Sequence, residues 1–316
     1  MKEYKKQVSI IMVNYNTKEL TKKAIQAVFD KTEGVEYEII VVDNDSKDGS
    51  VEELKKTFQD KITIIESNEN LGFGRANNLG IKQANGKYIF LLNSDTELIN
   101  NAIKIFYDYM EQNEQVGVCG GNLYNVNCVP EDSYIMHRDT ISSFFYWRYL
   151  ELFFNAISKF TKKSRYCRFN YSNKIKEVGL VVGADMFIRS SVLDESGLFD
   201  ENIFMYAEDT DLNFRIRKIG YSIMSVPQAK IFHYSSQSSN NEIKKYSQSL
   251  TGTYYVYFKY FGKRTWLVYL DIKLTMLRKI LTSMLLQNKD KAKTYLDIIK
   301  INKEKYLEQK NKYYKQ

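Results

Sequence analysis

Apolar runs typical of buried strands alternate with segments of helical spacing along the first hundred residues of the chain. The apolar runs predict strands at 8–13, 38–43, 61–67 and 87–95, and the other segments predict helices near 20–28, 51–58 and 75–84. Strands that alternate with helices in this way are typical of a parallel sheet covered on both faces. The sequence therefore predicts an α/β fold with a single, mostly parallel mixed sheet flanked by helices.

Polar clusters follow three of the predicted strands. They are NYN at 14–16, DNDS at 43–46 and NSD at 93–95. Ligands of open α/β sheets bind beyond the carboxyl ends of the strands, which is where these clusters lie. The clusters therefore indicate a ligand site at that edge of the sheet.

The pattern of a folded domain returns later in the chain. A strand-like segment with a Gly-Ala-Asp break covers 178–193, acids begin an amphipathic helix within 204–221, and a further strand is expected at 222–234. Residues 1–240 are therefore expected to form one domain. Within it, 138–168 has apolar residues at helical spacing together with 7 basic and 2 acidic residues. This pattern is typical of an amphipathic helix at a membrane interface, and a core-packed helix would explain it equally well.

The last part of the chain, 241–316, is predicted to be a basic helical extension. It carries 17 Lys or Arg residues and 6 Asp or Glu residues. The stretch 266–286 is long enough to cross a bilayer, but four charges interrupt it, and each central charge costs about 2.5–3.5 kcal/mol on insertion. A helix lying on an anionic membrane surface fits this pattern better. No recognisable nucleic-acid motif accompanies the basic charge, so we expect no nucleic-acid partner.

Composition adds to this picture only an indication of the cellular compartment in which the protein lies. The chain is 44% hydrophobic and 27% charged, which is ordinary for a folded protein. Cys119, Cys128 and Cys167 form neither a metal-ligand spacing nor an even disulfide set, which favours a reducing environment. The N-terminal apolar run is short and lacks a small-residue cleavage site, so it is interpreted as a first strand and not as a signal peptide. We therefore expect a cytoplasmic protein, peripheral on the inner face of the cell membrane.

The order of several motifs resembles that of family 2 glycosyltransferases, and most of all their rhamnosyltransferase-type branch. The motifs are VSIIMVNYN, VVDNDSKDGS, NENLGFGRANNLGI, YIFLLNSDTEL, GADMFIR, GLFDENIFMYAEDTDLNFRIRKIGY and a late His. The resemblance covers residues 8 to about 235. It implies a GT-A fold and inverting transfer of a sugar from a nucleotide-sugar donor.

The resemblance also implies a divalent cation, Mg²⁺ or Mn²⁺, at the NSD motif. Asp95 matches the last residue of the family's Asp-x-Asp element, whereas Asn93 departs from its first residue. Carboxylate oxygens suit such cations, and a cation would neutralise the charge of a nucleotide diphosphate leaving group. Some family members use a late His as a further ligand, which corresponds to His233 here. An isolated NSD would be a polar strand cap, and a lone His is more often structural.

The acids of the YAEDTDL motif match the family's catalytic position. The resemblance implies that Asp209 is the general base for the acceptor hydroxyl and that Glu208 orients it or touches the acceptor. Acids at a helix start can also serve only to cap the helix. Asp185, in GADMF, matches the acceptor side of the site, although a buried structural Asp is an equal alternative.

The remaining predicted residues bind the donor. In the family, a carboxylate at the end of the second strand recognises the nucleotide, which points to Asp43, while an Asx turn is the alternative. The glycines of NLGFGRANN permit close approach to a diphosphate, and Arg75 is a candidate partner for it, although many family members have Arg where this chain has Asn77. The complete donor set is Tyr15, Asn16, Asp43, Asn44, Ser46, Gly72, Arg75, Asn93, Ser94 and Asp95.

The resemblance suggests a dTDP- or UDP-sugar as donor, with dTDP-rhamnose first, and a lipid-linked saccharide as acceptor in surface polysaccharide synthesis. A hexosyl- or galactofuranosyltransferase that uses a UDP-sugar is the alternative within this class. A catalytically inactive nucleotide-sugar-binding scaffold is the alternative outside it. A nucleotidyltransferase is disfavoured because NYNTKEL, and not a glycine-rich basic loop, follows the first strand.

Overall fold

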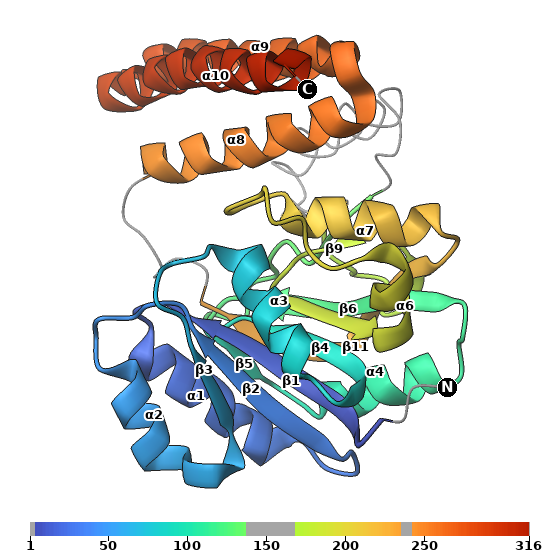
Figure 1. Ribbon diagram of the computed structural model, residues 1–316. Helices are drawn as coiled ribbons and strands as arrows, with labels where there is room; N and C mark the ends of the chain where they lie inside the picture. Colours follow the sequence, from blue (N-terminus) through green and yellow to red (C-terminus); the bar gives the residue numbers. More distant parts are fainter. Residues whose placement is uncertain (1–3, 137–167, 235–241, 316) are drawn as a thin grey trace. The chain divides into compact units, whose positions relative to one another are not determined.

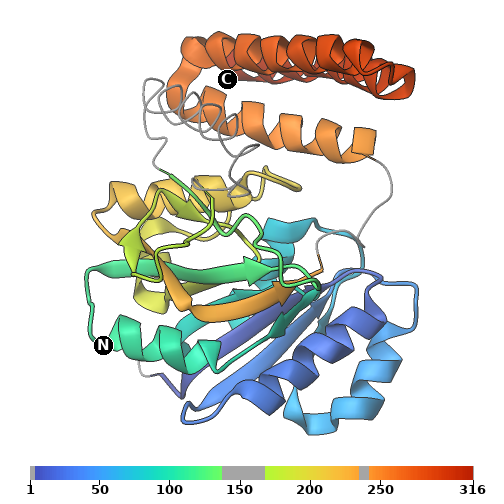
Figure 2. The same ribbon diagram turned by 180° about the vertical axis from the view of Figure 1, so that it is seen from behind.

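The computed structural model describes residues 4–136, 168–234 and 242–315 (Figures 1 and 2). The chain divides into two compact units. Unit 1 comprises Met1–Glu201 and Asp209–Ser236, and unit 2 comprises Asn202–Glu208 and Gln237–Gln316. Residues 202–208, which the sequence places in the first domain, therefore belong to unit 2. The amphipathic helix predicted at 138–168 lies outside the described residues except for Arg168.

Unit 1 is built from strands and helices. The elements predicted between 8 and 95, the helix within 204–221 and the strand at 222–234 are present, whereas the strand-like segment 178–193 forms two short strands followed by the start of a helix. The strands are β1 (Lys6–Asn14), β2 (Tyr37–Asp43), β3 (Thr63–Glu66), β4 (Gly86–Leu92), β5 (Thr96–Leu98), β6 (Val116–Tyr124), β7 (Tyr134–Ile135), β8 (Lys176–Glu177), β9 (Leu180–Val181), β10 (Asp185–Arg189) and β11 (Ser222–His233). The helices are α1 (Lys18–Lys31), α2 (Ser50–Phe58), the 3-10 turn η1 (Gln59–Lys61), α3 (Phe73–Gln83), α4 (Ala102–Glu111), α6 (Ser190–Ser196) and α7 (Glu208–Lys218).

The main sheet has the strand order β3-β2-β1-β4-β10-β6-β11-β5, and β8 also pairs with β11. The first four strands are parallel, whereas β10 runs antiparallel to both β4 and β6. Asn14 is in register with Asp43, so the polar ends of β1 and β2 lie side by side. The mixed sheet thus brings the predicted ligand-binding ends of β1, β2 and β4 to one edge.

Two apolar clusters cover the two faces of this sheet. Ile10 and Met12 of β1 belong to the cluster that includes residues of α1, α2 and α4. Ile11 lies on the opposite face and belongs to the cluster that includes residues of α6 and α7. Figure 2 shows α1, α2 and α4 on one face, and Figure 1 shows α3 and α6 on the other. The alternation of side chains along β1 therefore explains how helices cover the sheet on both sides.

The described residues of unit 2 form three helices, α8 (Glu242–Phe261), α9 (Thr265–Leu285) and α10 (Lys289–Lys315), with the 3-10 turn η2 (Gly262–Arg264) between the first two. Leu250, Tyr254 and Phe258 of α8 form its small core. The Tyr254 hydroxyl donates a hydrogen bond to Asn302 of α10, which fixes these two helices together. No helix among the described residues is both long and apolar enough to cross a membrane.

Candidate active site

Asn14, at the end of β1, is the centre of the polar cluster at the sheet edge. Its side-chain nitrogen donates to Asp43 Oδ2 at 2.6 Å and to Ser46 Oγ at 3.0 Å. The backbone N–H of Ser46 donates to Asp43 Oδ1 at 2.9 Å, as in an Asx turn. Asp43 is 3% exposed, so these bonds hold a nearly buried carboxylate in a fixed orientation. Asn14 was not among the predicted donor-binding residues, although its place in the NYN cluster indicated a position at the ligand site.

Tyr15 and Asn16 extend this cluster outward. Asn16 has a positive φ of 54°, its N–H donates to Ser46 Oγ at 2.9 Å, and its Oδ1 accepts from the N–H of Lys47 at 2.7 Å. Tyr15 is 47% exposed. The turn after β1 is therefore held by hydrogen bonds to the turn after β2, and it presents an exposed aromatic ring.

Asn44 holds the glycine turn before α3. Its Oδ1 accepts from the N–H of Leu71 at 2.9 Å, and its Nδ2 donates to Asn70 Oδ1 at 3.0 Å and to the carbonyl of Gly72 at 3.3 Å. Gly72 has a φ of 80°, which glycine adopts without the steric cost of a side chain. Three of the predicted donor positions, Asp43, Asn44 and Gly72, are thus joined in one hydrogen-bonded framework.

A second set of hydrogen bonds joins this framework to the NSD motif. Asn14 Oδ1 accepts from Thr17 Oγ1 at 2.8 Å, and Thr17 Oγ1 lies 3.1 Å from Ser94 Oγ. Asn14 Oδ1 also accepts from Thr21 at 2.7 Å. The structure therefore connects Asp43 to Ser94 through two residues that the sequence did not single out.

The predicted metal residues Asp95 and His233 lie side by side because β11 pairs with β5. His233 Nε2 is 3.6 Å from Asp95 Oδ1, and His233 Nδ1 is 3.3 Å from Glu131 Oε2. Asp95 is 9% exposed, and its carbonyl accepts from the N–H of Tyr234 at 2.8 Å. Glu131 lies in a stretch with no motif, so no signal in the sequence could have identified it.

These residues fit a cation that takes part of its coordination from the substrate. Among the described residues, no group of three or more His, Cys, Asp or Glu side chains is arranged to hold a metal ion. Asp95 and His233 nevertheless supply two suitable donors, and the buried Asn93 Oδ1 has no hydrogen-bond partner among the described residues. Mg²⁺ sites with few protein ligands are completed by water and substrate phosphates.

Asp209, in the first turn of α7, lies next to the chain segment that enters β10. Its Oδ2 accepts from the N–H of Gly183 at 3.2 Å, and its Oδ1 accepts from the N–H of Thr210 at 2.6 Å. The carbonyl of Ala184 accepts from the N–H of Asn93 at 3.0 Å, so this segment links Asp209 to the NSD motif. Burial raises the pKa of Asp209 above its ordinary value, although hydrogen bonds from Thr210 and Gly183 oppose this shift.

The backbone just before Asp209 adopts an uncommon conformation. Tyr206 and Ala207 have φ values of 68° and 74°, and Glu208, which follows them, is 7% exposed. Two successive left-handed residues cost free energy unless the surrounding structure holds them, and they often occur at functional sites. The conformation supports a functional role for the turn that presents Glu208 and Asp209.

The 196–201 segment is anchored to α3 through its backbone. Asn78 of α3 donates to the carbonyl of Phe199 and accepts from its N–H, both at 3.0 Å. Arg75 Nε donates to the carbonyl of Glu201 at 2.7 Å. The Nε of Arg75 is therefore committed to this segment, whereas the sequence suggested a diphosphate contact for this side chain. No feature of the sequence indicates the hydrogen bonds of the Asn78 side chain to the backbone of Phe199.

Asp185 differs from the other predicted site residues because none of its surface is exposed. Its Oδ2 accepts from the N–H of Gly121 at 2.6 Å, and its Oδ1 has no partner among the described residues. Burial raises the pKa of Asp185 to about 8. A side chain without exposed surface does not reach an acceptor in this conformation, so its position fits the structural alternative and not the acceptor-binding one.

The fold places the chain in the GT-A class. It resembles the solved structure of GalNAc-T7 with UDP, GalNAc and Mn²⁺ at a TM-score of 0.58 and 14% identity, over 80% of this chain and 47% of that one. The chain belongs to glycosyl transferase family 2, whose model matches residues 9–195. The predicted fold class and family are thereby confirmed.

Two curated relatives are similar to a large part of the chain. The low-salt glycan biosynthesis hexosyltransferase Agl10 of Haloferax volcanii is 26% identical over 220 residues, which is 68% of this chain and 63% of that protein. The N-acetylglucosaminyl-diphospho-decaprenol L-rhamnosyltransferase of Mycobacterium tuberculosis is 24% identical over 217 residues, which is 65% of this chain and 68% of that protein. The chain thus spans somewhat less than two thirds of the length of the haloarchaeal relative.

Proposed function

We propose that the protein is an inverting glycosyltransferase of glycan biosynthesis. Its donor is a dTDP- or UDP-sugar, with dTDP-rhamnose as the first candidate, and its acceptor is a lipid-linked saccharide. The proposal depends mainly on the hydrogen-bonded line from Asp43 through Asn14 and Thr17 to Ser94. This line unites the nucleotide-binding and diphosphate-binding positions that the family resemblance implies. A relative that is an L-rhamnosyltransferase of a diphospho-decaprenol saccharide supports the choice of donor and acceptor.

The donor nucleotide binds at the ends of β1 and β2. Asp43 is held by Asn14 and Ser46, and its remaining lone pairs accept hydrogen bonds from a pyrimidine imide or a ribose hydroxyl. The exposed ring of Tyr15 covers the base. The glycine turn at Gly72, fixed by Asn44, lets the backbone approach the diphosphate.

Asp95 and His233 hold Mg²⁺ or Mn²⁺, with Asn93 as a weaker third donor. A bound cation supplies positive charge that stabilises the departing nucleotide diphosphate. Glu131 orients the imidazole by its contact with Nδ1, which leaves Nε2 facing Asp95. Ser94 keeps the turn that carries Asp95 joined to the nucleotide-binding strands through its contact with Thr17.

Asp209 is the general base of the proposed reaction. Its carboxylate accepts the proton of the acceptor hydroxyl as that oxygen attacks the anomeric carbon and the bond from this carbon to the diphosphate oxygen breaks. Attack from the side opposite the leaving group inverts the anomeric configuration. A raised pKa makes the ionised carboxylate a stronger base than an exposed Asp, and the Gly183 N–H keeps it oriented. Glu208 precedes it and contacts the acceptor or orients the base.

The function is tested by incubating the purified protein with a panel of dTDP- and UDP-sugars in Mn²⁺, Mg²⁺ or EDTA and measuring released nucleotide diphosphate. We expect slow, metal-dependent release from one donor. Asp209→Asn should abolish transfer while donor binding is retained, and Asp95→Ala should weaken both. Asp30→Asn, an exposed acid on α1, is the matched control and should leave turnover unchanged.

Three outcomes would overturn the proposal. Failure to bind any nucleotide sugar would exclude a sugar-nucleotide enzyme. Pyrophosphate release from a nucleoside triphosphate and a sugar phosphate would identify a nucleotidyltransferase instead. A protein that binds one donor, fails to transfer it to a lipid-linked saccharide extract, and behaves identically after Asp209→Asn is a binding scaffold.

We further propose that α9 docks the protein on an anionic bilayer. The helix exposes an apolar stripe with spacings of three and four residues, and within it Leu274 and Leu281 are 62% and 63% exposed. Its other members are Trp266, Leu270, Leu277, Met284 and Leu285. Lys273, Arg278 and Lys279 lie on the same helix and complement anionic headgroups.

Flotation of the full chain with anionic liposomes at physiological salt tests this docking. Leu274→Gln with Leu281→Gln should move most of the protein to the free fraction, because two exposed apolar anchors are lost. Leu296→Gln with Leu307→Gln on α10 is the matched control, since these leucines are 48% and 42% exposed. Equal flotation of all three proteins, or none with wild type, would show that the stripe does not anchor the chain.

A further inference from the structure

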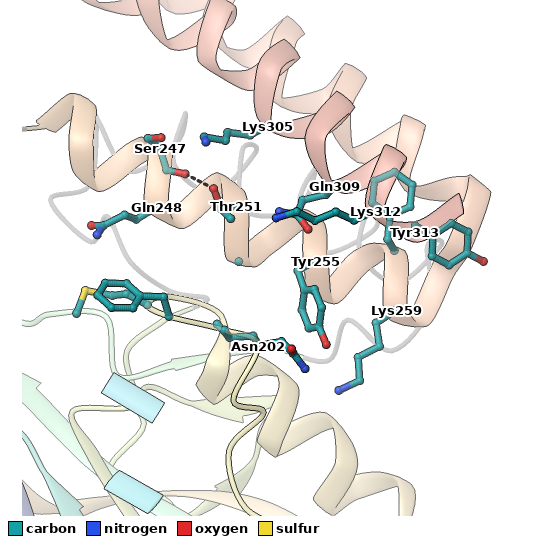
Figure 3. Close-up of a pocket in the computed structure, with 15 residues that line it drawn as sticks. Asn202, Ser247, Gln248, Thr251, Tyr255, Lys259, Lys305, Gln309, Lys312 and Tyr313 are labelled. Atoms are coloured by element: carbon teal, nitrogen blue, oxygen red, sulfur yellow. Dashed lines mark hydrogen bonds between the residues drawn. The ribbon is translucent and has the colours of Figure 1, made fainter. Parts of the chain in front are cut away.

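Unit 2 contains a cavity of about 590 Å³ that no part of the proposed function uses. Its walls are the 202–205 segment, α8 and α10, all of which belong to unit 2. Figure 3 shows Lys305, Gln309 and Lys312 reaching in from α10, opposite side chains of α8. The volume is in the range of cavities that bind small organic ligands.

The charged side chains that line the cavity are all lysines. Lys259 comes from α8, and Lys305 and Lys312 come from α10, whereas no Asp or Glu of the described part of the chain lines the cavity. Both α10 lysines share one carboxylate, Glu308, at 2.9 Å. Lys305 also lies 3.9 Å from Glu304, but neither Glu304 nor Glu308 lines the cavity, so the charged groups that face it are ammonium groups. Such a wall favours an anionic ligand, and the ammonium groups suit phosphate oxygens.

Aromatic rings form the apolar part of the same wall. Tyr255 extends from α8 toward the loop that carries Asn202 (Figure 3). Phe258 and Tyr313 stack at a ring-centroid distance of 5.4 Å, and Tyr313 remains 39% exposed. Aromatic faces beside lysines suit a ligand in which an anionic group is joined to a hydrocarbon chain or a sugar ring. A small inorganic anion would leave this apolar surface unused.

One wall of the cavity is formed by a segment that is close in the sequence to the proposed catalytic base. Met205 lines the cavity, and Asp209 follows it by four residues, so the chain between them spans at most about 14 Å in any arrangement of the two units. Gly252 of α8 fixes this wall, because a Cβ there would lie 2.0 Å from the carbonyl oxygen of Tyr206. Only glycine allows the turn before α7 to pack so closely on α8.

We propose that this cavity binds the diphosphate and adjoining isoprenoid of the lipid-linked acceptor. Lys305, Lys312 and Lys259 contact the phosphate oxygens, and Tyr255, Phe258 and Tyr313 contact the first isoprenoid units. This assignment depends on the proposed function for its acceptor class, but the binding chemistry of the cavity can be measured without any sugar transfer.

The test uses farnesyl diphosphate as the probe, kept below its micelle concentration, with the full chain in EDTA. Its binding is measured by calorimetry for wild type, Lys305→Gln with Lys312→Gln, and Lys303→Gln with Lys310→Gln. The second pair removes the same charge from α10 but does not line the cavity. We expect the cavity pair to weaken binding at least about tenfold, since one charge-assisted hydrogen bond contributes about that factor. The control pair should change it less than about twofold, as expected for remote screened charges.

Inorganic pyrophosphate and donor turnover complete the experiment. Pyrophosphate should bind more weakly than farnesyl diphosphate; equal affinity that is lost in the cavity pair would mean that the site takes a free anion, which overturns the lipid assignment. Equal weakening by both lysine pairs, or by neither, would show that the cavity is not the site. Donor hydrolysis by the control pair should match that of wild type. If wild type binds no nucleotide sugar, the proposed function fails while the calorimetric result still decides what the cavity binds.

Discussion

Replacement of Asp185 by Asn should change how the stability of unit 1 depends on pH. Asp185 lies on β10, which pairs with β4 and β6, and its side chain is fully buried. Its Oδ2 accepts from the N–H of Gly121, and its Oδ1 has no partner among the described residues. Asn has nearly the same shape, keeps the acceptor for Gly121, and does not titrate. The variant therefore removes the charge and leaves the packing in place.

The magnitude follows from the raised pKa of this carboxyl. Burial raises the pKa of Asp185 from 3.8 to about 8, so the folded state holds a proton that the unfolded state has released. The stability that comes from this proton is complete below pH 4 and is lost as the pH rises toward 8. Since one pKa unit corresponds to about 1.4 kcal/mol, the stability of wild type should fall by about 3 kcal/mol relative to Asp185→Asn between pH 5 and pH 8.

Unfolding in urea is monitored through hydrogen exchange of peptides from β6 and β10, so the free energy of unfolding of unit 1 is measured separately from that of unit 2. Asn78→Ala is the control, because it removes a buried polar side chain that does not titrate, so its effect should be the same at every pH. A pH-independent difference between wild type and Asp185→Asn would refute the reasoning. Loss of transfer in a stable Asp185→Asn would instead restore the acceptor-binding interpretation.

The remaining predictions concern catalysis, the stability of unit 1 and the metal. The kcat/KM of wild type should fall as the pH is lowered, and the fall should begin at a higher pH than an ordinary Asp would give. Burial raises the pKa of Asp209, and only its ionised form accepts a proton. Asn78→Ala should destabilise unit 1 in urea unfolding by about 2 kcal/mol, because both backbone groups of Phe199 lose buried partners. Gly252→Ala should lower kcat at unchanged donor KM and helix content, because its Cβ displaces Tyr206; an unchanged kcat would contradict this. EDTA should abolish transfer, and added Mn²⁺ should restore it.

Local pattern alone determined the elements that form the binding edge of the sheet. The apolar runs predicted the strands that became β1, β2 and β4, and acids marked the start of α7. Strand and helix periodicities are properties of contiguous residues, so they can be identified in a sequence without knowing what packs against them. The order of the motifs was sufficient to identify the family for the same reason, since it requires only residue types and their spacing.

Tertiary structure decided which of the predicted residues share a site. Pairing of β11 with β5 brings His233 to Asp95, and packing around β10 leaves the Asp185 side chain with no exposed surface. The lysine cavity likewise exists only because α10 and the 202–205 segment meet at α8. Contacts between residues far apart in the chain depend on strand order, helix packing and burial, and no local periodicity encodes these.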